Sequence, residues 1–467
     1  MKKKDLLKTM LLSAAVLSAV SLLGGCANND TSTASIQHQQ EPPKETQPVN
    51  NTQPTVQTAA EEEPLPDKTD AEADDEAEIS YDILKEFSYK LFAQNMEEEN
   101  PVLSPVSAYM ALSMAGLGAE NNTKAEFATV FGDDADMAGI CNGIMTTYPI
   151  STQNNTIALA NSAWISKNYA VSDNWLSNIN GIMHSEVFQK DLTSPAIVDD
   201  MNTWISEKTN GMIEKMVEKP LKDSAGLVLF NTVYFKAKWE EPFKKYSVYP
   251  DQFFMEDGTE IEAELMHKES EMEYFSNEFA QGLLFPYRYE EENTQYAFVA
   301  IKPIDENTQV RDLYRGLTPL VIKDLLAGRQ TETVNTKLPK FEIEFDKQLN
   351  ESLINMGLKD AFDFEKADFS GIGADGLTGS DNKNSLNQYN LYIDLVRQKA
   401  KIIVDDEGTE AAAVTEAIME CGAVLPSEEP KEIFFDRPFV YMIMNMEDEV
   451  PLFIGILDSP VVCGKQP

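Results

Sequence analysis

Histidine, cysteine and positive charge are scarce in this chain of 467 residues. It contains only three histidines, His38, His184 and His267. No pair of histidines has the spacing of a zinc motif, and no Gly-x-Ser-x-Gly sequence marks a nucleophile elbow. A Ser-His-Asp triad remains an alternative, because such triads are assembled by folding rather than by sequence proximity, but no motif indicates one. We therefore expect no enzyme, no metal ion and no cofactor.

Basic residues are outnumbered two to one. There are 38 lysines and arginines against 78 acids, which gives a formal net charge of −40. Such a chain should avoid nucleic acid and anionic lipid, because no basic patch reverses its overall charge. The acidity favours solubility and attraction to cationic partners, but net charge alone does not identify a particular partner.

The four cysteines do not form a disulfide framework. They are Cys26, Cys141, Cys421 and Cys463. If Cys26 is acylated, three remain, and one disulfide among these three depends on a geometry that sequence does not give. Cys421 is expected to be an exposed thiol, either open to oxidation or unreactive.

No apolar run is long enough for a comfortable membrane span. The longest, from about Leu11 to Leu23, follows four lysines, which is typical of a secretory signal. Leu23-Gly24-Gly25-Cys26 further resembles the bacterial lipobox, in which the cysteine receives a lipid and becomes the mature N-terminus. We expect a lipoprotein signal over 1–25 and anchoring at the outer face of a bacterial membrane. The alternative is a plain signal peptide with an incidental cysteine.

Residues 26–78 lack the large apolar side chains that a core requires. They begin rich in Asn, Thr, Gln and Pro and become acidic from Glu61 to Glu78. This composition predicts a lipidated cysteine followed by a solvated, disordered tether. Its expected role is to hold the folded part, 79–467, away from the membrane.

The most informative segment that is present runs from Val404 to Ala417. In an extended strand one face would carry the small residues Thr409, Ala411, Ala413 and Thr415. Such a strand could enter a sheet without a clash, and Gly408 before it offers a flexible backbone position. The alternative is a short helix, because runs of Ala with Glu favour helices and Thr409 could cap one.

This segment resembles the proximal hinge of the serpins, the serine-protease-inhibitor superfamily. Further serpin-like motifs follow in the family's order over about residues 79–467. They are Asn100–Ser107, Asn231–Phe243, Leu338–Phe341, Met356–Leu358, Ala367–Gly371, Asp436–Phe439 and Pro451–Gly455. The resemblance implies an α+β fold, a single domain of three β-sheets with about eight or nine surrounding α-helices. It also implies an exposed reactive-centre loop at about 408–433.

Local patterns agree with this fold. Apolar spacing predicts an amphipathic helix over 83–92 and a nearly all-apolar helix from Ser104 to Leu117. Residues 201–211 are predicted to form a helix that ends at Gly211. Continuous apolar runs predict a strand over 227–235, buried on both faces, and a closing pair over 439–446 and 452–457.

In serpins a protease attacks the reactive-centre loop as a substrate and forms an acyl-enzyme. The cleaved loop then inserts into the central sheet and distorts the trapped protease. The resemblance therefore implies a suicide-substrate inhibitor of serine proteases, a monomer, and it leaves cysteine proteases open as further partners. The implied hinge is Asp406, Glu407, Gly408, Thr409, Glu410, Ala411, Ala412, Ala413 and Thr415.

The family's sheet-opening region matches four residues. Ser104 and Asn231 match its central polar cluster, and Trp239 matches an indole near the point where insertion begins. Gln398 stands where most members have a histidine. Because glutamine does not titrate, we expect no pH-tuned opening here.

Family spacing implies that the cut lies between Gly422 and Ala423. Because the loop is a few residues longer than in many members, Met419, Cys421 and Val424 remain alternatives. No Lys or Arg occurs from Gly408 to Pro430. We therefore expect an elastase-like or subtilisin-like target, since a trypsin-like pocket would find no cation.

Two other interpretations remain. A non-inhibitory serpin that acts as a surface binding protein would be expected to carry a bulky or charged residue on the inward hinge face, which this chain lacks. A lipoprotein enzyme or solute-binding protein has no recognisable site motif. Gly371–Gly376 has the spacing of a dinucleotide-binding loop but follows no hydrophobic strand, so we interpret it as a flexible loop.

Overall fold

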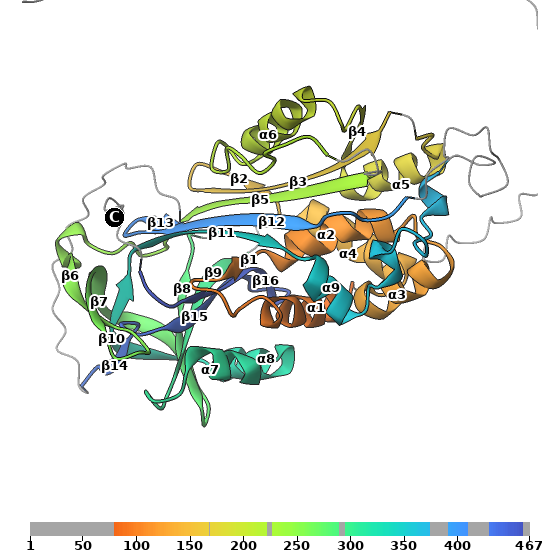
Figure 1. Ribbon diagram of the computed structural model, residues 1–467. Helices are drawn as coiled ribbons and strands as arrows, with labels where there is room; N and C mark the ends of the chain where they lie inside the picture. The colour runs from red at the N-terminus through yellow and green to blue at the C-terminus, as the bar shows by residue number, and fades with distance from the viewer. Residues whose placement is uncertain are drawn as a thin grey trace, which may run out of the picture. The chain divides into compact units, whose positions relative to one another are not determined.

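The computed structural model describes residues 79–167, 169–221, 227–288, 295–373, 391–409 and 429–460. These residues belong to one compact unit that spans Asp75–Pro467. None of their helices has both the length and the hydrophobicity that a membrane crossing requires. Over these ranges the chain forms nine α-helices and two large sheets (Figure 1).

The first sheet has seven strands in the order β11-β12-β13-β5-β3-β2, with β4 beside β3. The strands are β2 (Ile150–Ser151), β3 (Asn155–Ser166), β4 (Glu186–Lys190), β5 (Leu227–Lys238), β11 (Phe341–Gln348), β12 (Arg397–Val404) and β13 (Gly408–Thr409). The long strands β3 and β5 pair antiparallel over eleven positions, from Asn155–Ala237 to Ile165–Leu227. The strand predicted at 227–235 is therefore confirmed and extends to Lys238. It is not buried on both faces as predicted, because buried and partly buried residues alternate along much of it.

One face of this sheet rests on α2 (Pro105–Gly116), every residue of which is buried. Ser104 caps this helix and accepts a hydrogen bond from the Ser107 N–H at 3.4 Å. A nearly all-apolar helix can lie directly beneath a sheet because no polar face needs solvent. The prediction for this segment is confirmed, as is the first helix, α1 (Asp82–Ala93). Three further helices flank these two: α3 (Asn121–Phe131), α4 (Asp134–Thr147) and α5 (Asp173–Met183).

The opposite face of the sheet carries α6 (Ala196–Lys208), as Figure 1 shows. This helix packs on β3 and β5 through a hydrophobic cluster that is separate from the main core. The cluster includes Trp164, Trp204, Val228 and Phe230. The helix ends at Lys208 rather than at the predicted Gly211. Gly211 follows in the left-handed region at φ +80° and donates its N–H to the Ser206 carbonyl at 2.8 Å.

The second sheet has nine strands in the order β1-β16-β15-β9-β8-β7-β10-β14, with β6 beside β7. They are β1 (Val102–Leu103), β6 (Val248–Phe254), β7 (Glu260–Ser276), β8 (Ala280–Pro286), β9 (Tyr296–Pro303), β10 (Gln330–Pro339), β14 (Lys431–Phe434), β15 (Phe439–Asn445) and β16 (Val450–Leu457). The closing strand pair predicted near the C-terminus is confirmed as β15 and β16, which are antiparallel.

Three sheets were expected, and the difference lies in β7. This strand has 17 residues, and its first part pairs with β6 while its last part pairs with β8. Two of the expected sheets therefore share one strand and join into a single hydrogen-bonded sheet.

Short elements complete the unit. The remaining helices are α7 (Val310–Gly316), α8 (Pro319–Ala327) and α9 (Asn350–Met356). The 3₁₀ turns are η1 (Lys245–Ser247), η2 (Asp360–Phe362) and η3 (Ser370–Ile372).

Ion pairs connect β11 and β12 on their outer face. Each basic residue of β12 meets an acid of β11 at 2.6–2.8 Å; the pairs are Asp346–Arg397, Glu344–Lys399 and Glu342–Lys401. Since the two strands also pair over eight positions, they form one two-stranded unit.

Candidate functional site

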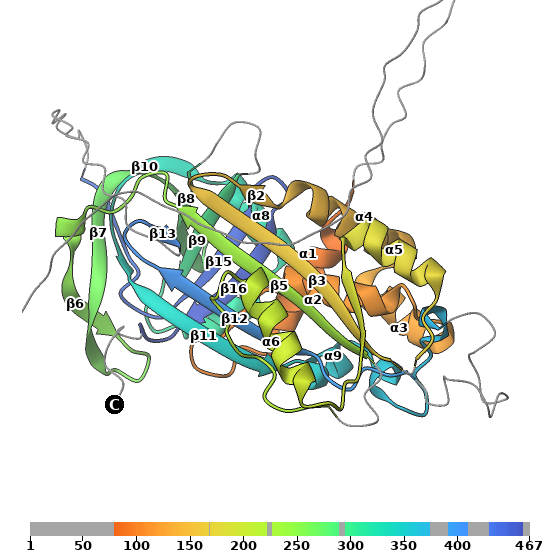
Figure 2. The ribbon, with the colours of Figure 1, turned by 90° about the horizontal axis from the view of Figure 1, so that it is seen from above.

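The candidate site is the short strand β13, which lies between β5 and β12 at one end of the seven-stranded sheet (Figure 2). Gly408 lies opposite Lys238, and Thr409 lies opposite both Ala237 of β5 and Val404 of β12. An isolated parallel bridge also joins Leu227 of β5 to Ile393, which lies before β12 begins. The core-side residues Leu229 and Val233 of β5 are only partly buried in between.

Gly408 approaches the backbone of β5 closely. A Cβ at this position would overlap the Ala237 carbonyl oxygen and lie 2.7 Å from the Lys238 Cα. Both neighbours are backbone atoms in a paired strand, so neither can move aside. The sequence suggested backbone flexibility as the reason for this glycine, but Gly408 does not have a positive φ. The requirement is for space.

Thr409 is 2% exposed and points into the core. Its hydroxyl oxygen lies 2.6 Å from the hydroxyl of Tyr287. The Tyr287 ring stacks on Trp239 at a centroid distance of 4.8 Å and an interplanar angle of 9°. Burial raises the pKa of Tyr287 above its ordinary value, so this hydroxyl stays protonated.

Trp239 holds the chain that leads into β13. Its indole Nε1–H donates to the Asp405 carbonyl at 2.8 Å, and its backbone N–H donates to the Glu407 carbonyl at 3.0 Å. The Phe243 N–H donates to the Asp406 carbonyl at 2.9 Å. Segment 405–407 is thus fixed through its backbone, which leaves its three acidic side chains for other contacts.

Those three acids have different environments. Asp405 accepts hydrogen bonds from the N–H groups of Glu407 and Gly408 at 2.8 and 3.1 Å, yet burial raises its pKa. Asp406 pairs with Lys340 at 2.7 Å, and Glu407 pairs with Lys245 at 3.4 Å. Burial opposes the charge of Lys340, but its bond to Asp406 and the surrounding acids prevail and raise its pKa. A local turn closed by Asp405 therefore precedes the strand.

The central polar cluster lies further along the sheet. The side-chain amide of Gln398 accepts from the Ser104 N–H and donates to the Ser104 carbonyl, both at 2.8 Å. Asn231 instead donates its Nδ2–H to Asn161 Oδ1. The backbone carbonyl of Asn231 accepts a hydrogen bond from the Ser107 hydroxyl at 3.2 Å. The Asn231 Oδ1 atom is buried without a hydrogen-bond partner. Gln398 and Asn231 thus do not bond to each other directly but are linked through Ser104 and Ser107.

Several of the residues singled out by sequence lie outside the described ranges. They are the anchor Cys26, the rest of the hinge (Glu410, Ala411, Ala412, Ala413 and Thr415) and the reactive-bond candidates Met419, Cys421, Gly422, Ala423 and Val424. The dinucleotide-like segment is described only through Gly373. Of the cysteines, Cys141 is buried as a free thiol whose pKa burial raises to about 12.

Sequence reasoning missed Tyr287, Lys340 and Asn161. Each of them contacts a residue that the sequence did single out. Tyr287 contacts Thr409, Lys340 contacts Asp406, and Asn161 contacts Asn231. Only the apolar run before Tyr287 hints that this tyrosine is buried, and nothing in the sequence indicates its partner.

Catalytic and metal chemistry find little support in the described residues. No group of three His, Cys, Asp or Glu in these ranges is arranged to hold a metal ion. His184 ends α5 in the left-handed region. Nε2 of His267 is buried without a hydrogen-bond partner, 3.7 Å from Asp251, and burial and then Lys337 lower the pKa of this histidine.

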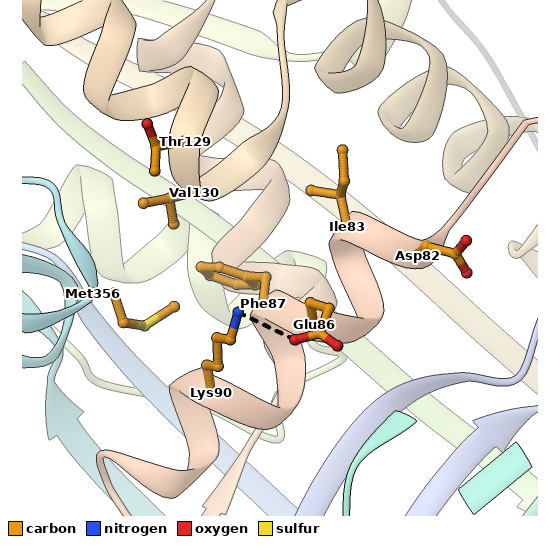
Figure 3. A pocket seen from close by; sticks show the side chains of 8 residues that line it. All are labelled: Asp82, Ile83, Glu86, Phe87, Lys90, Thr129, Val130 and Met356. Atoms are coloured by element: carbon orange, nitrogen blue, oxygen red, sulfur yellow. Dashed lines mark ion pairs between the residues drawn. The ribbon is translucent and has the colours of Figure 1, made fainter. Parts of the chain in front are cut away.

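A pocket of about 270 Å³ opens between α1, α3 and the end of α9 (Figure 3). Phe87, Val130 and Met356 supply apolar lining, and the ion pair Glu86–Lys90 spans 3.1 Å beside them. The Thr129 hydroxyl donates to the Ala125 carbonyl of its own helix at 2.9 Å. The pocket therefore offers no hydroxyl nucleophile with a base beside it.

Comparison with known proteins gives one family. The family description "Serpin (serine protease inhibitor)" matches residues 82–460. An uncharacterized serpin-like protein of Thermococcus kodakarensis is 30% identical over 81% of this chain and 88% of its own length. Iripin-2 of Ixodes ricinus is 30% identical over 77% of this chain and 87% of its own.

Solved structures agree with this result. The thermophilic serpin Tengpin in its native state matches with a TM-score of 0.72 and 32% identity, over 81% of this chain and 93% of that one. Its latent state matches with a TM-score of 0.67 over 80% and 96%. Serpins are protease inhibitors rather than enzymes, in agreement with the expectation from sequence. The match spans nearly all described residues, and this chain belongs to the serpin family.

Proposed function

We propose that this chain is a suicide-substrate inhibitor of serine endopeptidases. It would trap the acyl-enzyme by inserting its cleaved reactive-centre loop between β5 and β12. The observation that carries this proposal is the position of β13, which already pairs with both strands at the point where insertion would begin. Thr409 is buried there, and its hydroxyl lies 2.6 Å from that of Tyr287.

The register of β13 predicts where the rest of the loop would go. If pairing continues past Thr409 in the same register, Thr415 comes to lie opposite Asn231 on β5 and Gln398 on β12. Asn231 Oδ1 has no partner before insertion, and a threonine hydroxyl can donate to it. The small inward face of the loop then meets the partly buried core side of β5.

The energy available is of the right order. Inserting about ten residues makes roughly ten ladder hydrogen bonds at about 0.5–1.5 kcal/mol net each, so on the order of 10 kcal/mol in total. Distorting a protease costs an energy comparable with typical folding stabilities of about 5–15 kcal/mol. The uncleaved inhibitor is therefore a metastable state held by a kinetic barrier.

The absence of Lys and Arg from Gly408 to Pro430 defines the target class. We propose an elastase-like or subtilisin-like protease, with the cut between Gly422 and Ala423 and with Met419, Cys421 and Val424 as alternative positions. The proposed location is the outer face of a bacterial membrane, where lipidated Cys26 anchors the chain and 27–78 acts as a tether.

A protease panel tests the function directly. The full chain is incubated with elastase, subtilisin and trypsin, and the products are examined on denaturing gels and by mass determination of the released C-terminal peptide. We expect a gel-stable complex with elastase or subtilisin and a peptide that begins near Ala423. A trypsin complex that forms faster would overturn the proposed target class, and stable binding without cleavage would indicate a non-inhibitory serpin.

The insertion step has its own test. Thr409→Arg places a charged side chain on the inward face and should turn the inhibitor into an ordinary substrate. Glu410→Arg, which the alternation of an inserted strand would place on the opposite face, is the matched control. If Thr409→Arg inhibits as well as the parent, insertion is not the mechanism. The nicked parent should also resist heat better than the intact chain, and Thr415→Val should reduce that gain more than Thr415→Ser.

A further inference from the structure

The amides and hydroxyl beneath the seven-stranded sheet use methionine sulfur as an acceptor. Asn161 Nδ2 lies 3.6 Å from Met145 Sδ, and Ser185 Oγ lies 3.3 Å from Met114 Sδ. Asn231 Nδ2 lies 4.0 Å from Met110 Sδ. A thioether is a weak acceptor, so these contacts depend on the oxidation state of the sulfur.

Met145 differs from the other two in its exposure. Met110 and Met114 are 0% exposed, whereas Met145, in the last turn of α4, is partly exposed at the edge of the core. Of these three side chains, Met145 is therefore the most accessible to a small oxidant in solution.

Met145 is linked to the central strands through Asn161. The same Asn161 amide nitrogen donates to the Met183 carbonyl at 3.0 Å, at the end of α5. Its Oδ1 accepts the bond from Asn231. Asn161 on β3 thus connects α4, α5 and β5, and it is the partner of the Asn231 side-chain amide.

We propose that Met145 is a site of reversible oxidation by hydrogen peroxide, and that its sulfoxide weakens the attachment of β3 and β5 to the helices beneath. In the reaction the peroxide O–O bond breaks, an S–O bond forms on Met145, and water leaves. The sulfur loses two electrons, which reduce the peroxide. Only the side chain of Met145 changes covalently.

The sulfoxide changes the contact in both size and polarity. An oxygen added on the side of the sulfur that faces Asn161 would come closer to Nδ2 than a hydrogen bond allows, so the amide has to move. An oxygen on the other side would place a strong dipole against apolar core. Either outcome disturbs the bond between Asn161 and Asn231, and Asn231 already has one unpaired atom.

The experiment treats the full chain with hydrogen peroxide and measures both oxidation and unfolding. Peptide mass spectrometry follows the addition of one oxygen to Met145, and the thermal midpoint follows the stability of the sheet. We expect the midpoint to fall by several degrees as Met145 is oxidised and to recover after treatment with methionine sulfoxide reductases. Unfolding is the chosen readout because oxidation of Met419 in the reactive loop would alter protease recognition by itself.

Three variants control the result. Met145→Leu should keep its midpoint in peroxide, and Met145→Gln, which carries a polar group of similar size, should lower the midpoint without peroxide. Met255→Leu removes another partly exposed methionine, beside β6 at the opposite end of the unit from α4 (Figure 1), and should give no protection. The proposal is overturned if Met145 stays reduced while Met255 is oxidised, or if Met145→Leu loses as much stability in peroxide as the parent.

Discussion

The hydroxyl groups of Tyr287 and Thr409 lie 2.6 Å apart inside the core, although the two residues are 122 positions apart in sequence. This contact joins the first inward-facing residue of the hinge to the aromatic stack formed by Tyr287 and Trp239. Thr409 is therefore held in the sheet by a specific hydrogen bond as well as by packing.

Replacing Tyr287 by phenylalanine should loosen the hinge. Tyr287→Phe leaves the Thr409 hydroxyl buried without this partner, which should cost about 0.5–1.5 kcal/mol of unfolding free energy. The region around 408–409 should then become more sensitive to limited proteolysis. Tyr314→Phe removes another buried hydroxyl, which donates to the Tyr89 carbonyl at 3.2 Å, and serves as the control. Equal proteolysis at the hinge in both variants would contradict this role for Tyr287.

Adding a methyl group at Gly408 should displace β13. In Gly408→Ala the new Cβ meets backbone atoms of Ala237 and Lys238, so the strand has to move away from β5. Overpacking of this kind costs about 1–3 kcal/mol. We expect lower stability in urea unfolding and a larger fraction of inhibitor cleaved as substrate. Gly181→Ala in α5, where a Cβ has no neighbour within 4 Å, should be neutral or stabilising. A Gly408→Ala protein with parental stability would exclude the steric role.

The carboxyl group of Asp405 should give the native state a pH dependence. Burial raises its pKa above the ordinary value of 3.8, so the native state binds this proton more tightly than the unfolded state. The resulting stabilisation is complete below about 3.8 and is lost as the pH rises through the raised pKa. At neutral pH the buried charge is a cost.

Asp405→Asn tests this dependence. The asparagine oxygen can still accept from the N–H groups of Glu407 and Gly408 but carries no charge. The variant should be at least as stable as the parent at pH 7, and its stability should vary less between about pH 4 and 6. Asp405→Ala, which removes the oxygen that accepts both hydrogen bonds, should be destabilised. Urea unfolding across this pH range checks the prediction, which is wrong if Asp405→Asn is the weaker protein at pH 7.

Gln398→His should add a second pH dependence to the one that Asp405 gives the parent. Glutamine forms both hydrogen bonds to the backbone of Ser104, and an imidazole ring cannot reproduce that pairing. The variant should lose about 0.5–1.5 kcal/mol at pH 7.5. Because position 398 is only 7% exposed, burial should lower the histidine pKa. Stability is then retained above about pH 6.5 and lost as the pH falls. Chemical unfolding at pH 5.5 and 7.5 measures the difference, and identical behaviour of parent and variant would contradict it.

Local features of this fold could be predicted from sequence because their causes are local. The apolar composition of 104–117 determines a buried helix, and the apolar run at 227–235 determines a strand, although one of its faces is only partly buried. The small residues of the hinge and the absence of cations after Gly408 can likewise be read directly from the printed chain.

Contacts between distant segments could not be predicted in this way. Gln398 pairs with Ser104 across 294 residues, and Tyr287 reaches Thr409 only because β8 ends beside Trp239. The steric reason for Gly408 depends on the register between β13 and β5. Such contacts follow from how strands align in space, and the one-dimensional pattern does not contain that alignment.

The ion pairs across β11 and β12 determine which part of the sheet can move. Three basic residues of β12 form ion pairs with acids of β11. Separating these two strands would therefore break the ion pairs and the backbone hydrogen bonds together. On its other side, within the described residues, β12 is joined to β5 through the two-residue strand β13. The sheet should therefore open between β12 and β5, with β11 and β12 moving together as one rigid unit.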